Sequence, residues 1–384
     1  MTTIDVFRAR ARSRQVIALT LLLAVQFVGV GVLFPLHAFT SPPGSPALQA
    51  FAVGLALFGL LTIYGVWAEK RWGAWAALTL VSFKLTIDVY SWALGLDRPL
   101  ALLSAAVNLG IIALLFRIPA PAGAEISRMQ KVFFGCVLAL AANVGVIGMF
   151  NPPHAVNTLP FAVPPLHARF LGAMYLSGAT FMALAILARR WHEVRVVTPM
   201  VSVWTGLLGL VSLLHLEAFD WAREQVWTWF AAYIAFPLIA AWMAWQQRAV
   251  EDPPEGAPLG PALRGYLAAQ GAAVTLLALG LLLVPDALAA RWPWKATPLL
   301  VQIYSAPFMS YGVGSLLAAR RRAWAEVRIM IAATLVFTVG VLGASLVHRG
   351  LFAPAAPATW LWFGGFALAT AVLAALGLLS RGRV

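Results

Sequence analysis

The sequence predicts an all-α, polytopic membrane protein of about 12 transmembrane helices, arranged as three tandem, parallel four-helix repeats. The prediction rests on composition, on regularly spaced apolar segments and on similarity of the chain to itself. Of the 384 residues, 61% are hydrophobic and only 11% are charged, and the mean hydropathy is +0.84. Soluble domains contain about 45–50% apolar and about 25% charged residues. We therefore expect lipid to surround much of this chain.

A membrane-spanning helix needs about 20 mostly apolar residues. The first such segment follows several arginines, but it is too long for the apolar core of a signal peptide, which has about 7–15 residues. We therefore expect it to be retained as the first helix. The segments of this kind lie near 16–34, 47–67, 73–94, 99–116, 132–150, 168–188, 196–215, 226–246, 265–284, 298–318, 326–347 and 359–379.

The distribution of basic residues predicts the orientation, because cytoplasmic loops are enriched in Lys and Arg. With a cytoplasmic N-terminus, 20 of the 27 basic residues fall on the cytoplasmic side and six on the outer side. We expect an inner-membrane protein with both termini in the cytoplasm. The net charge of +13 is then a topology signal beside anionic lipid headgroups, so the lipid bilayer, and no nucleic acid, is the expected partner.

The chain also resembles itself. Residues 152–219 align with 285–352 without a gap, and 19 of these 68 positions are identical. A weaker match, with a small gap, adds the first third of the chain. The predicted repeats are 15–117, 130–246 and 263–380. An even number of helices gives every copy the same orientation, so the repeats are parallel, and we expect a pseudo-threefold bundle.

Four polar residues inside predicted helices are candidates for solute binding or ion coupling. Lys84 and Asp88 are charged and lie four residues apart on one helix face. A charge in mid-membrane is costly and by default marks function, but a self-compensating pair that fixes helix packing is an equal alternative. Gln26 and Asn143 occupy equivalent positions of the first two repeats, where interhelical hydrogen bonding is the simpler interpretation.

Histidines near the outer ends of the helices are candidate metal or haem ligands, because neutral imidazole is the commonest metal ligand. No diagnostic spacing accompanies them, so hydrogen bonding to water, headgroups or loop carbonyls is the favoured interpretation. The candidates are His37, His154, His215 and His348.

A W-x-E-V-R element occurs twice at the cytoplasmic turn, and an arginine precedes each glutamate by four residues. This spacing predicts local ion pairs that order the turn, with a gate or a lipid-headgroup site as the alternative. The cluster consists of Arg189, Glu193, Arg195, Arg322, Glu326 and Arg328.

Motifs for an enzyme are lacking in the sequence, which has no G-x-S-x-G and no P-loop, and no loop is long enough for a soluble domain. We expect a protein that is not an enzyme, and the sequence identifies no cofactor. The first hypothesis is a transporter or permease for a small solute. The alternatives are a non-catalytic or assembly subunit with membrane-protein partners, and a haem- or metal-binding protein that uses the outer histidines.

Overall fold

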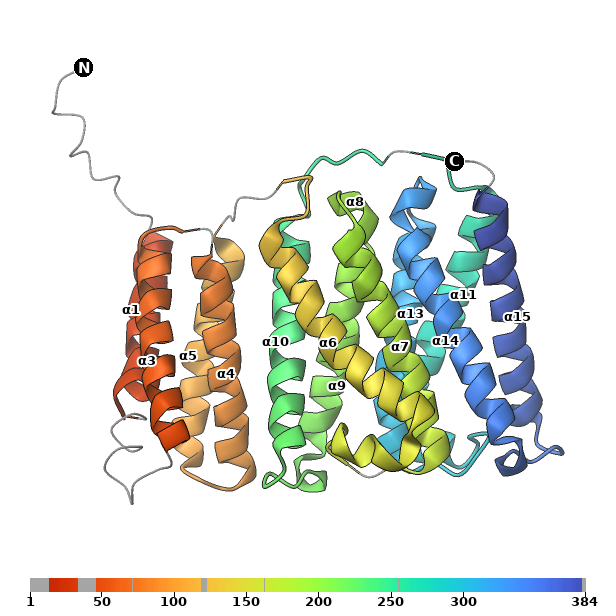
Figure 1. Ribbon diagram of the computed structural model, residues 1–384, viewed down its shortest axis with the longest axis horizontal. Coiled ribbons are helices and arrows are strands. Elements are labelled where there is room, and N and C mark those ends of the chain that lie inside the picture. Colours follow the sequence, from red (N-terminus) through yellow and green to blue (C-terminus); the bar gives the residue numbers. More distant parts are fainter. Residues whose placement is uncertain are drawn as a thin grey trace. The chain divides into compact units, whose positions relative to one another are not determined.

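The computed structural model describes residues 14–33, 46–70, 72–118, 123–161, 163–254 and 256–381. Within these ranges the chain is helical and contains no β-strand, only two isolated bridges. The chain divides into two compact units, Met1–Pro121 and Ala122–Val384, which we call the N-terminal and C-terminal units (Figure 1).

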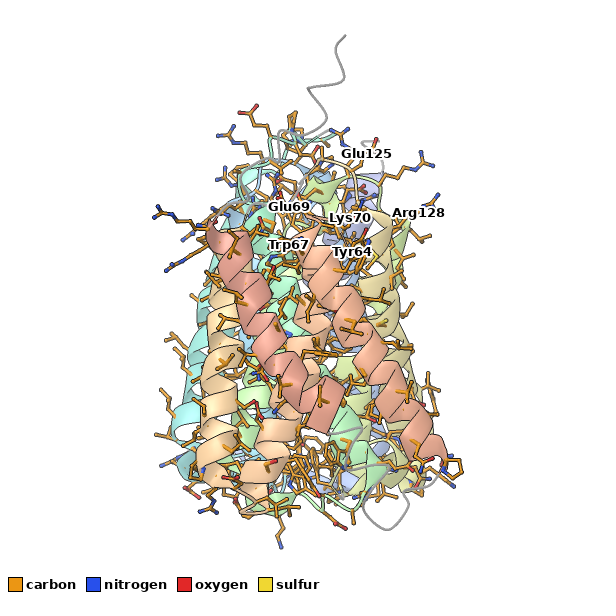
Figure 2. All side chains as sticks on the ribbon, turned by 90° about the vertical axis from the view of Figure 1, so that its left-hand side faces the viewer. Tyr64, Trp67, Glu69, Lys70, Glu125 and Arg128 are labelled. Atoms are coloured by element: carbon orange, nitrogen blue, oxygen red, sulfur yellow. The ribbon has the colours of Figure 1, made fainter. Side chains whose placement is uncertain are left out.

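The described residues of the N-terminal unit form four helices and a short π-helical segment. Figure 2 shows Tyr64, Trp67, Glu69 and Lys70 together at the end of the third segment, where aromatic and charged side chains suit a membrane–water interface. The segments are α1 (Arg14–Phe27), η2 (Val28–Leu33), α3 (Pro46–Trp67), α4 (Gly73–Ala93) and α5 (Arg98–Arg117).

The C-terminal unit contains eight long helices and several short ones. The long helices are α6 (Arg128–Phe150), α7 (Pro165–Leu187), α9 (Val197–Leu214), α10 (Glu224–Gln246), α11 (Pro261–Leu283), α13 (Pro298–Ala319), α14 (Arg328–Val347) and α15 (Pro357–Arg381). The short ones are η3 (Pro152–Asn157), α8 (Trp191–Val194), η4 (Leu216–Ala218), α12 (Pro285–Ala289), η5 (Trp324–Glu326) and η6 (Arg349–Leu351). We call the end with η3 and α12 the Pro-rich end, and the end with α8 and η5 the Arg-rich end.

Nine helices of the described chain are long and apolar enough to cross a membrane. Large apolar side chains also lie on their outer surfaces, for example Leu187 at 74% and Leu361 at 77% exposure, which only lipid or a partner would cover. The prediction of an all-helical, multi-pass membrane protein is thereby confirmed. The other three long helices, α1, α4 and α13, fall outside the nine, and α1 has only 14 residues.

Glycines bring α6 and α7 into close contact. A β-carbon on Gly172 would lie 2.3 Å from the backbone nitrogen of Met149, and one on Gly148 would lie 2.8 Å from the carbonyl oxygen of Ala168. Small residues at a helix interface let the two backbones approach, as is common between membrane helices. These glycines therefore fix the crossing of α6 over α7 that is visible in Figure 1.

The two halves of the C-terminal unit contact each other reciprocally. α7 packs against α14, and α13 packs against α9. Ser177 donates from Oγ to the carbonyl of Ala333 (2.6 Å), and Ser310 donates to the carbonyl of Met200 (2.9 Å). In the gap-free alignment Ser177 corresponds to Ser310, and Met200 corresponds to Ala333. The two hydrogen bonds therefore join equivalent positions but run in opposite directions between the halves. This is an isologous, twofold contact between the two halves of the C-terminal unit.

Candidate functional site

Lys84 and Asp88 form a buried ion pair within the N-terminal unit. Lys84 Nζ lies 2.6 Å from Asp88 Oδ1, and the Asp88 side chain is 5% exposed. Both residues lie on α4, one helical turn apart, which is the spacing that lets their side chains meet. The structure thus brings these two candidate residues together.

Residues of α5 complete this cluster. Ser104 Oγ accepts from Lys84 Nζ (2.8 Å) and donates to Asp88 Oδ2 (2.9 Å), and Asn108 Nδ2 donates to the same carboxylate oxygen (3.0 Å). Gln26 of α1 donates to the carbonyl of Ser104 (3.1 Å). The carboxylate therefore accepts three side-chain hydrogen bonds, and the cluster connects α1, α4 and α5.

Sequence reasoning missed Ser104 and Asn108, although their spacing of four residues repeats that of Lys84 and Asp88. That spacing in an otherwise apolar helix is the signal that would have found them. Asn108 is fully buried, and its Oδ1 has no hydrogen-bond partner among the described residues. A buried acceptor of this kind fits a bound water molecule.

A cavity of about 280 Å³ lies between α6, α7, α9 and α10 of the C-terminal unit. Its volume is near the lower limit of small-molecule sites, which run from about 300 to 1,000 Å³. At the Pro-rich end its lining is polar, with Asn157, Thr158, Glu224, Gln225 and Thr228. Farther in, the lining is apolar and aromatic and includes Tyr175, Phe181, Met182, Met200, Trp204, Trp229, Tyr233 and Phe236.

Two tyrosines connect opposite walls of the cavity. The hydroxyls of Tyr175 on α7 and Tyr233 on α10 are hydrogen-bonded to each other, and both residues line the cavity together with Asn143, an exposed residue of α6. α10 also contains Pro237, whose nitrogen carries no hydrogen and cannot donate to the carbonyl of Tyr233. On α9, Gly209 leaves room for that carbonyl, because a β-carbon there would lie 2.6 Å from its oxygen.

The second half carries different side chains at the equivalent positions. Tyr311, which the gap-free alignment pairs with Gly178, is 3% exposed and stacks on Phe337 at a centroid distance of 4.8 Å. Many of the polar lining residues have apolar counterparts when the same alignment is extended in both directions, whereas Thr158 and Thr205 align with Arg291 and Thr338. The polar–apolar pairs include Asn143 and Leu276, Tyr175 and Phe308, Glu224 and Pro357, Thr228 and Leu361, and Tyr233 and Phe366.

The histidines each bond to a different group. His154 Nδ1 lies 2.8 Å from Asn151 Oδ1, and His215 Nε2 lies 2.6 Å from Gln302 Oε1. His348 Nε2 accepts from Arg169 (2.7 Å), and its pKa is lowered by partial burial and then by the Arg169 charge. Within the described residues, no three His, Cys, Asp or Glu side chains come together as metal ligands. His37 lies outside the described residues.

A fifth histidine, His167, is buried and forms hydrogen bonds through both ring nitrogens. Nε2 lies 3.0 Å from the carbonyl oxygen of Lys295, so it must carry the proton, and Nδ1 then accepts from the Tyr304 hydroxyl. His167 lies on α7 and Tyr304 on α13, so the neutral imidazole connects the two halves of the C-terminal unit.

At the Arg-rich end, the glutamates bind backbone groups of their own turns. Glu193 Oε1 accepts from the backbone N–H of Arg189 (2.9 Å), and Glu326 Oε2 accepts from that of Arg322 (2.9 Å). The side-chain partner of Glu193 is Arg328 of α14, not the arginine four residues before it.

Arg195 is the counterpart of Arg328 in the alignment but has a different partner: it donates to the carbonyl of Val250 (3.0 Å). Glu326 instead faces Arg321, with N and O 4.0 Å apart. The twofold pattern is therefore broken at this end of the C-terminal unit.

The linker between α10 and α11 is held by Asp252, whose side chain is completely buried. Oδ1 accepts from Arg190 (2.7 Å), and Oδ2 accepts from the backbone N–H of His192 (2.8 Å). Burial alone would raise the pKa of Asp252, but these hydrogen bonds, with one from the His192 ring, hold the pKa below its usual value.

Comparison with known proteins gives no match: no family model fits the chain, and no curated protein and no solved structure is similar to it. Any function must therefore be argued from the cavity and the polar clusters themselves.

Proposed function

We propose that this protein is a permease-like membrane protein that takes a small, largely apolar solute into the cavity between α6, α7, α9 and α10. The observation that carries the proposal is the cavity, which has a polar mouth at the Pro-rich end and an aromatic interior. A concave, mostly apolar site with a few polar groups is the usual form of a small-molecule site.

The contrast between the two halves supports a specialised site. Gly178 lines the cavity, whereas Tyr311, which the alignment pairs with it, is a buried aromatic residue. Five polar lining residues also have apolar counterparts in the second half. A cavity that arose from loose packing alone would not concentrate hydroxyl, amide and carboxylate groups in the half that stays open.

We further propose that the chain crosses the inner membrane about 12 times as three tandem, parallel repeats, 15–117, 130–246 and 263–380, with both termini cytoplasmic. Support comes from helices that cover each predicted segment and from contacts that recur at equivalent positions of the last two repeats. Trp229 donates to Ser212 (2.8 Å), and Trp362 donates to Ser345 (2.9 Å). In this orientation the mouth of the cavity faces outward.

The Lys84–Asp88 cluster has a structural role in this proposal. Both carboxylate oxygens are satisfied by Lys84, Ser104 and Asn108. A buried pair with this many hydrogen bonds is stable without a ligand and fixes how α4 packs on α5, to which Gln26 of α1 is also bonded.

Native mass spectrometry of the full chain, extracted from its own membrane in mild detergent, tests the proposal. We expect a small-molecule adduct on the wild type that is lost from Gly178→Tyr, which places a phenol ring in the cavity. The matched control is Gly364→Tyr, where an added β-carbon meets no atom within 4 Å.

The outcomes separate the hypotheses. An adduct that survives Gly178→Tyr, or a wild type without any adduct, would contradict binding in this cavity. Stoichiometric protein subunits in the spectrum would instead favour the assembly-subunit hypothesis.

A further inference from the structure

A carboxylate lies at the mouth of the cavity. Among the described residues that line the cavity, Glu224 is the only charged one. It lies at the first position of α10 and is exposed. A solute that binds at the Pro-rich end of the cavity would lie near this carboxylate.

The neighbouring Arg223 binds backbone carbonyls and forms no ion pair with Glu224. The guanidinium of Arg223 donates to the carbonyls of Leu159 (3.2 Å) and Pro160 (3.1 Å), so it holds the loop that follows η3. In the described part of the chain, no basic side chain forms an ion pair with Glu224. The carboxylate therefore keeps its charge available to a ligand.

Three other polar side chains at the mouth donate to backbone carbonyls. Thr158 donates to the carbonyl of Ala155 (3.0 Å), Thr228 donates to that of Glu224 (3.3 Å), and Gln225 Nε2 donates to that of Asn157 (3.3 Å). Oxygen acceptors remain at each of these side chains, so the mouth accepts hydrogen bonds from a ligand that brings N–H or O–H groups.

Aromatic rings lie directly below the mouth. Trp229 and Tyr233 both line the cavity and pack edge to face, with centroids 4.4 Å apart. The face of an aromatic ring attracts a cation, and its area also favours an apolar chain. Phe181 and Met182 farther along the lining continue the apolar surface.

We propose that the solute is a cationic amphiphile, a primary ammonium headgroup on a short apolar chain. The headgroup binds Glu224 and the mouth oxygens, and the chain extends toward Phe181 and Met182. This inference rests on the proposed function, because it assigns a substrate class to the same cavity.

The test uses three probes with the same chain: octylammonium, 1-octanol and octyl sulfate. Binding to the full chain in nanodiscs of zwitterionic lipid is measured by isothermal titration calorimetry. We expect octylammonium to bind about fivefold more tightly than 1-octanol, because an exposed ion pair contributes up to about 1 kcal/mol, and octyl sulfate to bind most weakly. Glu224→Gln should remove this preference, whereas Glu217→Gln, in the same connection but outside the cavity lining, should keep it.

Failure of this inference and failure of the proposed function give different results. If all three probes bind equally, or if Glu224→Gln keeps the preference, the cationic class is wrong, while binding abolished by Gly178→Tyr still supports the cavity. If Gly178→Tyr changes the binding of none of the probes, the cavity is not their site, and both proposals fail together.

Discussion

Arg328 donates a hydrogen bond to Glu193, which lies 135 residues earlier in the chain. The pair connects α14 to the turn after α7, so it joins the two halves of the C-terminal unit at the Arg-rich end. The carboxylate of Glu193 also accepts from two backbone N–H groups of its own turn. One side chain therefore orders a local turn and a contact between halves.

A double-mutant cycle measures this contact. We expect Arg328→Gln and Glu193→Gln to show a coupling energy of about 0.5–1 kcal/mol in thermal unfolding in detergent, because the pair is close but Arg328 remains half exposed. The comparison cycle uses Arg321→Gln and Glu326→Gln, whose charged atoms are 4.0 Å apart, and should give a smaller value. Equal coupling in the two cycles would contradict a specific Arg328–Glu193 contact.

Lys84→Met should destabilise the N-terminal unit strongly, because it leaves the Asp88 carboxylate buried without its counter-ion. Loss of one partner of a buried pair costs about 3–5 kcal/mol. Adding Asp88→Leu should restore part of the stability, because the uncompensated charge is then absent. Unfolding in detergent, followed by circular dichroism, gives these values.

Lys70→Met is the control for that experiment, because it makes the same chemical change at an exposed position. If Lys84→Met were no more destabilising than Lys70→Met, the cluster would not stabilise the fold. The structural role proposed for it would then be wrong.

Two glycines on α7 should respond oppositely to the same substitution. Gly172→Ala should be destabilising by about 2 kcal/mol or more, because its β-carbon would lie 2.3 Å from Met149 N. Gly178→Ala should be neutral or stabilising by about 0.5–1 kcal/mol, because the nearest atom, on Trp204, is 3.7 Å away and alanine favours the helix. Melting temperatures in nanodiscs would distinguish the two, and a similar effect at both positions would contradict the close contact of α6 with α7.

The linker that follows α10 should loosen in acid. Because the folded pKa of Asp252 is lowered, its stabilisation is fully present above the unfolded pKa of about 3.9 and is lost as pH falls through the folded value. Hydrogen exchange of the backbone amides of residues 247–254 should accelerate about fivefold when the pH falls below the folded pKa of Asp252.

Asp252→Asn should exchange fast throughout and lose the pH dependence. Arg190→Ala should partly reproduce this effect, and Arg189→Ala, at an exposed neighbouring position, should not. Unchanged acid sensitivity in Asp252→Asn would exclude this carboxylate as the cause.

Much of the helical architecture could be predicted from the sequence, because long apolar runs and basic turns are local properties. The partner of Glu193 could not, because i,i+4 spacing suggested Arg189, while the actual donor depends on how α14 packs. The cluster around Asp88 was half predicted. Lys84 and Asp88 were conspicuous as charges, whereas Ser104 and Asn108 are small polar residues whose importance depends on which face of α5 meets α4.

The cavity could not be predicted from the sequence either. Asn143 was identified as a polar residue in a helix, but its place in the lining depends on Gly178, which a sequence reader treats as an ordinary packing glycine. Parallel copies are compatible with a ring and with a reciprocal pair alike. Which faces meet depends on packing: Ser177 bonds to Ala333 and Ser310 to Met200, so the contact between the two halves of the C-terminal unit is reciprocal.

The reciprocal contact of α7 with α14 and of α13 with α9 has the geometry of a homodimer whose subunits have been joined into one polypeptide. In a true homodimer every substitution occurs twice, so opening a cavity in one subunit opens it in the other and weakens the core at two places. Covalent fusion removes that constraint. Here Gly178 lines the cavity in one half, whereas Tyr311, at the aligned position, is buried against Phe337 in the other, so two similar halves of one polypeptide can carry different side chains at matching positions.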